Sequence, residues 1–72
     1  MACINSDGSL TSVAKFILRS LLKPMTEEAL AKEVGLPLFR IRMSIREFLD
    51  AELVRQDNEK YVITEKGKEK LE

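Results

Sequence analysis

The chain has 72 residues, which is enough for one domain with a thin hydrophobic core. Twelve basic side chains balance twelve acidic ones, so the formal net charge is zero, and any nucleic-acid binding must depend on local clusters of positive charge. With no histidine and one cysteine, the sequence excludes an internal disulfide and the common metal-ligand sets, and it holds no nucleophile–base pair, so we expect no cofactor, no metal and no enzymatic activity.

Residues 1–8 are polar and end in the Asp7-Gly8 pair, so we expect an N-terminal tail followed by one domain over residues 9–72. The start of the chain lacks the basic flank and the apolar stretch of a secretory signal. No apolar run approaches the roughly 18–20 residues that span a bilayer. The sequence therefore predicts a cytoplasmic protein without membrane contact.

The first element is an amphipathic helix, for which Ser9 is the expected N-cap. Its apolar residues recur at intervals of three and four, as on one face of a helix: Leu10, Val13, Ala14, Ile17, Leu18, Leu21 and Leu22. The Lys23-Pro24 pair ends it, because proline pushes the preceding residue out of the α region. Phe16 lies near the edge of the apolar face, and we favour its burial under the last helix over its joining an exposed patch.

Two further helices follow. Thr26 is the expected N-cap of the second helix, and Gly35 ends it by taking a left-handed conformation. Pro37 opens a third helix over about residues 37–52, because proline suits the first turn of a helix. The expected inner stripe of this third helix is Leu38, Ile41, Ile45, Phe48, Leu49 and Glu52.

The end of the chain predicts a hairpin and a short helix. Two β-prone runs, residues 53–56 and 60–63, flank Asp57-Asn58-Glu59, whose Asp and Asn tolerate tight turns. Thr64 is the expected cap of a last helix through about Leu71. Gly67 either weakens that helix or lets it lie close to another backbone. The fold class is therefore α+β and mostly helical.

This order of elements resembles a winged helix-turn-helix domain. Residues 30–36, LAKEVGL, look like the positioning helix and turn of bacterial and archaeal regulators, and residues 36–54 resemble their recognition helix and its exit. Residues 61–68, YVITEKGK, resemble the end of the wing and the start of the last helix in MarR-, ArsR- and PadR-like proteins. Two positions depart from the family's pattern: Pro37 stands where Ser or Thr is common, and Glu52 where glycine is usual.

The resemblance implies a transcriptional regulator that binds double-stranded DNA, with the third helix in the major groove and the wing on the backbone. Arginines occupy the first half of that helix and acids the second half. Arginine can bind guanine through two acceptors, and apolar groups can pack on the thymine methyl. The expected DNA contacts are Phe39, Arg40, Arg42, Met43, Arg46, Arg55 and Lys60. Because one module this small reads only a few base pairs, we expect a homodimer.

A second interpretation of the third helix remains open. Two pairs, Arg42 with Glu47 and Arg46 with Asp50, lie near or at helical neighbour spacing, which also fits ordinary surface ion pairs. Phe39 and Met43 form an outward apolar pair of the kind that marks protein contacts. The alternative function is a protein–protein interaction module that uses Phe39 and Met43, joined by Leu36. Tyr61 on the wing can stack on a sugar or base, although a half-buried strand residue needs no such role.

Overall fold

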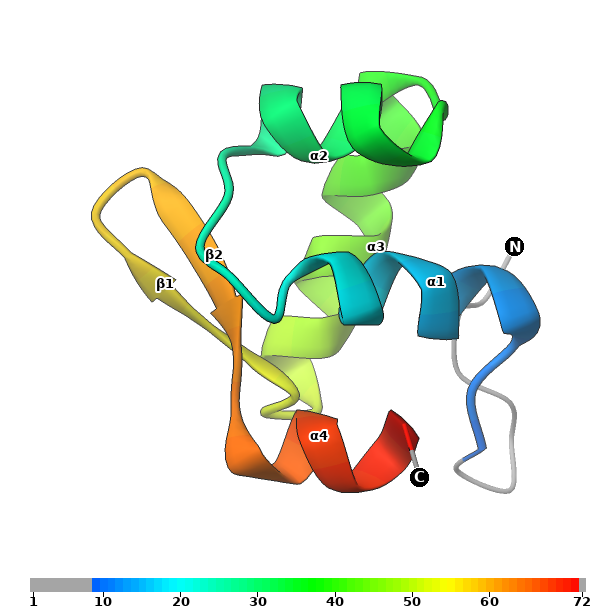
Figure 1. Ribbon diagram of the computed structural model, residues 1–72, viewed down its shortest axis with the longest axis vertical. Helices are drawn as coiled ribbons and strands as arrows, with labels where there is room; N and C mark the ends of the chain where they lie inside the picture. Colours follow the sequence, from blue (N-terminus) through cyan, green and yellow to red (C-terminus); the bar gives the residue numbers. More distant parts are fainter. Residues whose placement is uncertain (1–8, 72) are drawn as a thin grey trace.

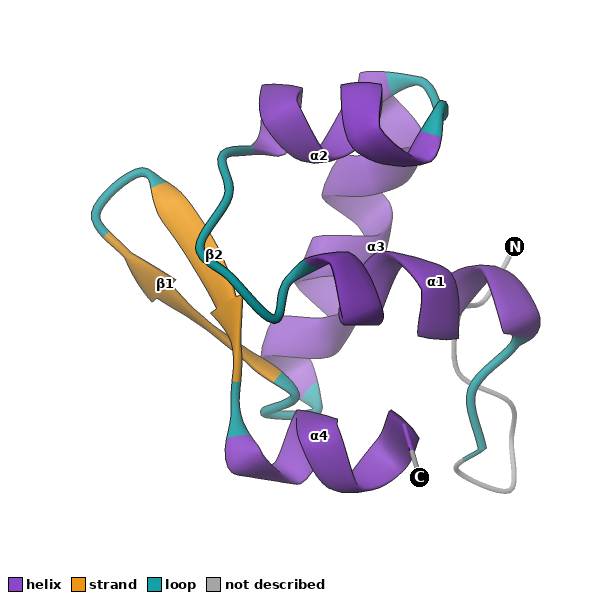
Figure 2. Ribbon diagram, in the orientation of Figure 1, coloured by secondary structure: helices purple, strands orange, loops and turns teal. Residues whose placement is uncertain are grey.

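The structure is a computed structural model, and it describes residues 9–71. Over these residues it contains four helices and one antiparallel hairpin, in the order α1 (Ser12–Ser20), α2 (Glu27–Val34), α3 (Leu38–Asp50), β1 (Val54–Asp57), β2 (Lys60–Ile63) and α4 (Glu65–Leu71). In Figure 1, α3 runs behind α1 and α2, the hairpin projects to one side and α4 closes the lower end. Figure 2 shows that helices dominate the fold. The chain is therefore α+β and mostly helical, a layout compatible with a winged helix but not specific to it. The predicted tail, residues 1–8, lies outside the described residues.

The core is formed by side chains from the three longer helices, the hairpin and the segments next to them. The spacing of three and four along α1 places Ala14, Ile17 and Leu18 on one buried face. Among residues 9–71, the buried apolar residues are Leu10, Ala14, Ile17, Leu18, Leu21, Leu30, Ile41, Ile45, Phe48, Leu53, Val54 and Ile63.

Helix α1 differs from its prediction at both ends. Its N-cap is Thr11 and not Ser9, because the Thr11 Oγ1 accepts a hydrogen bond from the Ala14 N–H at 3.1 Å. The helix ends at Ser20, upstream of the Lys23-Pro24 pair that was expected to end it. The helix is therefore shorter than the apolar pattern suggested.

The predicted burial of Phe16 is wrong. Its side chain is 49% exposed, and Val13 and Leu22 are exposed as well. At about 100° per residue, Phe16 points almost opposite to the direction shared by Ala14 and Leu18, so α4 cannot cover it while packing on the core side of α1. The chain therefore exposes an aromatic ring on α1 that the sequence did not predict to be exposed.

The predicted ends of α2 are confirmed. The Thr26 Oγ1 accepts a hydrogen bond from the Ala29 N–H at 3.1 Å, and Gly35 ends the helix with φ 73°. Pro37 is the N-cap of α3 rather than its first residue, and α3 ends at Asp50 rather than Glu52. The two confirmed predictions concern the Thr26 hydroxyl cap and the left-handed Gly35. Both depend only on residues within one turn of the chain.

The buried face of α3 is narrower than the predicted stripe. The buried residues are Ile41, Ser44, Ile45 and Phe48. Leu38 is only half-buried, and Leu49 and Glu52 are exposed. The predicted stripe included too many residues, because Leu49 lies at the edge of the buried helix face and Glu52 lies beyond the end of the helix.

The hairpin turn is one residue shorter than predicted. Asp57 pairs with Lys60, which leaves Asn58-Glu59 as a two-residue turn with Asn58 at φ 61°. Met25 pairs with Tyr61 of β2 through N–H···O bonds of 3.0 and 2.8 Å. This bridge fixes the hairpin to the segment that enters α2.

Helix α4 is held close to the end of α3. The Thr64 Oγ1 accepts a hydrogen bond from the Gly67 N–H at 3.1 Å, which confirms the predicted cap, and its hydroxyl donates to the Glu52 carbonyl oxygen at 2.8 Å. A Cβ on Gly67 would lie 2.7 Å from the Ile63 Cγ1 and closer still to the Leu53 carbonyl oxygen. Of the two roles predicted for Gly67, the close backbone approach is the one that the structure shows.

Glu52 offers a stabilising substitution. It follows the C-cap of α3 with φ 63°, a left-handed conformation that costs a side-chain-bearing residue about 1 kcal/mol or more. We expect Glu52→Gly to raise the free energy of unfolding by about 0.5–1 kcal/mol, because the gain exceeds the added entropy of the unfolded chain. Urea denaturation measures this change.

The matched control for this substitution is Glu52→Ala. It also removes the exposed 3.8 Å ion pair with Lys66 but keeps the Cβ. Exposed pairs of this kind contribute little to stability, so Glu52→Ala should not stabilise. Equal stabilisation by alanine and glycine would show that the carboxylate, and not the backbone, is the source of the effect.

Candidate nucleic-acid interface on helix α3

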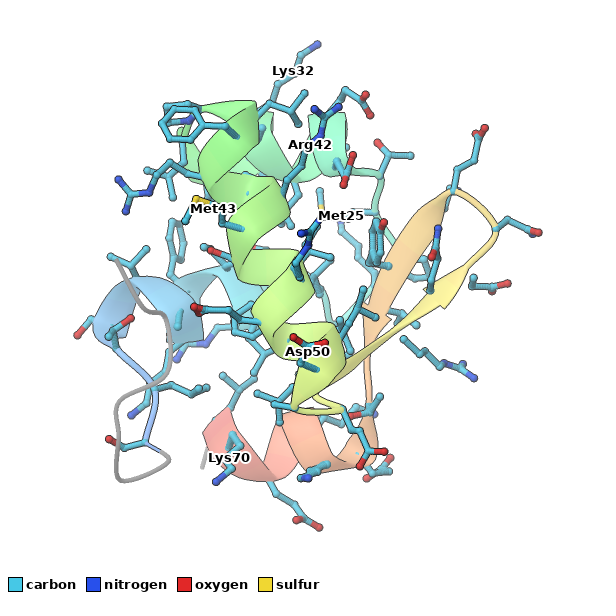
Figure 3. The ribbon with its side chains drawn as sticks, turned by 180° about the vertical axis from the view of Figure 1, so that it is seen from behind. Met25, Lys32, Arg42, Met43, Asp50 and Lys70 are labelled. Carbon is cyan, nitrogen blue, oxygen red and sulfur yellow. The ribbon has the colours of Figure 1, made fainter. Side chains whose placement is uncertain are left out.

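Helix α3 crosses one face of the molecule with no other element in front of it, as Figure 3 shows. Phe39, Met43, Arg46 and Asp50 follow each other at intervals of four, three and four residues, which places them along one outward line of the helix. Phe39 is 63% exposed and Met43 is 49% exposed. This line of four side chains, which we call the outer stripe, lies opposite the buried residues of α3.

Arg42 lies on the flank of α3 that faces α2 (Figure 3). Its Nε donates a hydrogen bond to the Glu27 Oε1 at 3.3 Å. Fifteen residues separate these two partners, so no helical spacing in the sequence predicts the pair. The first turn of α2 thus holds an arginine that we expected to contact DNA.

Arg46 is exposed on the outer stripe. Within residues 9–71 no ion pair joins it to Asp50, so the surface pairing considered for these two residues does not form. Arg46 and Arg42 line the same shallow hollow as Met43. The structure therefore brings two of the predicted arginines together.

Arg40 occupies a different flank of the helix. Two residues of helix turn the chain by about 200°, which places Arg40 about 160° around the axis from Arg42. It is half-buried, as is Glu47 on the same flank. We expected both Arg40 and Arg42 to contact DNA, and the structure does not bring these two side chains together.

The hairpin presents its basic residues away from α3. Consecutive residues of a strand point to opposite faces, so Lys60 and Tyr61 of β2 face opposite ways, and Arg55 shares the face of Lys60. Tyr61 is on the α3 side, because it lines a hollow together with Arg42 and Arg46. Arg55 and Lys60 are therefore on the far face of the hairpin from the arginines of α3.

The hollow between α3 and the hairpin was not predicted as a site. Its lining residues are Glu27, Arg42, Ile45, Arg46, Leu49 and Tyr61. The half-buried Tyr61 places an aromatic ring beside two guanidinium groups. In the sequence, the only indication of this hollow was a tyrosine in the predicted second strand. A tyrosine there is equally typical of ordinary strand packing.

The positive charge on this face has acidic neighbours. Glu27 and Glu28 begin α2, and Glu59 lies at the tip of the hairpin. The first turn of α3 has no side-chain cap, so its N–H groups can donate to water or to a phosphate. The surface therefore favours anions only near Arg42, Arg46 and the first turn of α3, and not across the whole face.

No protein-family model matches this chain, and no curated protein matches it in sequence. Within residues 9–71 no group of three or more Cys, Asp or Glu side chains is placed to hold a metal ion. None of the helices in that range is both long enough and apolar enough to cross a lipid bilayer. The surface of α3 is therefore the main basis for inferring a function.

Proposed function

We propose that the protein is a winged-helix transcriptional regulator of the cytoplasm that binds double-stranded DNA through α3. The observation that carries this proposal is the placement of Arg42 and Arg46 side by side on an uncovered helix, next to the hairpin. The order of helices and strands supports it, because a winged helix presents its third helix and its wing to the same duplex.

In this proposal Arg46 and Phe39 reach the base edges in the major groove, with Met43 packing on a thymine methyl. Arg42 contacts a base or a phosphate after leaving Glu27. Arg40 acts from the flank of the helix on the phosphate backbone. Arg55 and Lys60 add long-range attraction, since they lie on the far face of the wing.

The direct experiment is selection of duplexes from a random-sequence pool, followed by a salt titration of the bound complex. We expect an enriched sequence whose affinity falls steeply as salt rises, because each phosphate contact releases counterions. A pool that shows no enrichment and no salt-dependent binding would refute the proposal.

Glu27→Gln provides a sharper test of the role of Arg42. The substitution releases the guanidinium and removes a negative charge from the edge of the surface. We expect tighter binding to the selected duplex by about threefold to tenfold and a salt slope steeper by about one, since one more cation can neutralise a phosphate. Fluorescence anisotropy over a salt series measures both.

Glu33→Gln is the matched control, because Glu33 is an exposed acid on the same helix with no ion pair to α3 among the described residues. The Thr26 cap remains intact in both variants, so a melting curve is sufficient to check α2. Equal affinities for the two variants would place Arg42 outside the interface.

A separate observation favours a second function. Phe39 and Met43 are both exposed on the outer stripe, which is more apolar surface than a helix that only reads phosphates requires. The second candidate is a protein-interaction module in which these two side chains form the contact. Phe39→Ser should then abolish binding of a partner while the melting temperature is retained.

A further inference from the structure

The outer stripe brings exposed apolar side chains next to a basic one. Phe39 is 63% exposed and Met43 is 49% exposed, and one turn of helix separates them, about 6 Å along the axis. Arg46 is exposed about one turn further on, and no ion pair engages it within residues 9–71. We call these three residues the Phe39–Arg46 row. None of the described elements lies in front of this part of α3 (Figure 3).

A shallow hollow lies along the row. Its lining residues are Arg42, Met43 and Arg46. Because the stem of an arginine is apolar and its head is charged, the hollow offers apolar surface next to two guanidinium groups. Arg42 is bonded to Glu27 through Nε at 3.3 Å, and its side chain remains 59% exposed. A ligand that carries an apolar group beside a carboxylate therefore matches the hollow, and Arg46 can bind that carboxylate without breaking the Arg42–Glu27 pair.

We propose that the Phe39–Arg46 row is a docking surface for an acidic amphipathic helix of another protein. The members of the row follow each other at intervals of four and three residues, the spacing with which one helix packs along another. The partner helix packs its apolar residues on Phe39 and Met43 and places a carboxylate at the height of Arg46. Two adjacent apolar groups favour such a helix over a phosphate backbone, which offers them no apolar contact.

Asp50 limits where the partner helix carries its acids. It is exposed on the same line of α3, about 6 Å beyond Arg46 along the axis. A carboxylate of the partner at that height would meet a like charge, which opposes binding. The acids of the partner therefore lie near Arg46 and Arg42, and a neutral or basic residue lies opposite Asp50. The partner is thus defined by an apolar pair with acids at one end, and not by acidity along its whole length.

This inference rests on the second proposed function and names the chemistry of its partner. A helix laid on α3 covers the surface that the first proposed function assigns to DNA, so the helix and a duplex exclude each other. One helix on each side makes an interface below about 1,200 Å², so we expect a dissociation constant on the order of 50 μM.

The test begins with selection of phage-displayed random peptides on the immobilised 72-residue chain, without DNA. Peptides of about 16 residues are long enough, because they span about 24 Å as a helix. We expect enriched peptides with two bulky apolar residues three or four positions apart and with Asp or Glu within about one turn of them. One selected peptide is then synthesised and titrated against the wild type and its variants by fluorescence anisotropy.

Two substitutions in the row should each weaken binding of the selected peptide by at least about tenfold. Arg46→Glu replaces the cation by a charge that repels the carboxylate of the peptide. Phe39→Ser removes the most exposed apolar contact. Both positions are exposed, so loss of folding is not expected, and melting curves check it. Arg55→Glu is the matched control, because it makes the same change on the far face of the hairpin, and it should alter the affinity by less than about twofold.

Reversing the charge on both sides separates an ion pair from a change in folding. Each acidic residue of the selected peptide is replaced in turn by lysine. We expect one of these peptides to bind the Arg46→Glu chain at least about tenfold more tightly than it binds the wild type, because the pair is restored with opposite signs. A fold damaged by Arg46→Glu would not be restored by a change in the peptide.

Enriched peptides without acidic residues, or a selected peptide whose affinity Arg46→Glu leaves unchanged, would overturn the acidic partner. If such a peptide still depended on Phe39, the second function would stand with a partner of different chemistry. A selection without enrichment, or peptides insensitive to both substitutions, would count against this inference and the second function together. None of these results depends on DNA, so each is distinct from a failed duplex selection.

Discussion

Gly67→Ala is expected to lower the free energy of unfolding by about 2 kcal/mol and the melting temperature by about 8–16 °C. The added methyl group would meet the Leu53 carbonyl oxygen and, at 2.7 Å, the Ile63 Cγ1. The carbonyl belongs to the backbone that leaves α3, so no side-chain rotation relieves the contact. The clash outweighs the gain of about 1 kcal/mol that alanine brings to a helix. Urea and thermal denaturation measure the loss.

Two controls separate this clash from other effects of alanine. Glu69→Ala changes an exposed position of α4 and should shift stability by less than about 0.5 kcal/mol. Gly35→Ala has no atom within 4 Å of the new Cβ but keeps φ 73°, so it should cost only about 1 kcal/mol of backbone strain. A Gly67→Ala protein as stable as the wild type would show that α4 does not pack as the structure describes.

The Arg42→Ala/Arg46→Ala double variant is expected to bind a selected duplex about 100-fold more weakly than the wild type, because each guanidinium contact to a base contributes about 1–3 kcal/mol. If either side chain contacts a phosphate instead, the salt slope also falls by about one for each lost contact. Anisotropy titrations at several salt concentrations separate these two roles.

The matched control is Arg55→Ala/Lys60→Ala, which removes the same charge from the far face of the wing. We expect this pair to lose less than about tenfold, since it acts only through long-range attraction. If Arg55→Ala/Lys60→Ala lost more affinity for the duplex than Arg42→Ala/Arg46→Ala, the DNA interface would lie on the opposite face of the hairpin.

The sequence correctly predicted the parts of the fold that depend on interactions within one turn of the chain. The Thr26 and Thr64 caps and the left-handed Gly35 depend on neighbours three or four residues away, and all three are confirmed. The exposure of Phe16 was missed because the residue was placed at the edge of the apolar face, whereas the helical turn of about 100° per residue directs it away from the core. The hairpin turn was misplaced because its register depends on pairing across the strands.

The sequence predicted the candidate site only where the positions of its residues follow from periodicity within one helix. Helical periodicity located Phe39 and Met43 as an outward apolar pair. It could not show that Glu27 would hold Arg42, because that pair joins two helices across the fold. Nor could it show that Arg55 and Lys60 lie behind the wing, since the direction of a strand face depends on where α3 packs.

The most direct test of DNA binding by α3 is backbone amide chemical-shift mapping by NMR as a selected duplex is added. The proposal predicts that the largest shifts fall on residues 38–46 of α3, with Tyr61 of the wing. It also predicts little change along α1 and α4. Shifts that cluster on α1, α4 or the far face of the wing, or no shifts at saturating duplex, would contradict it.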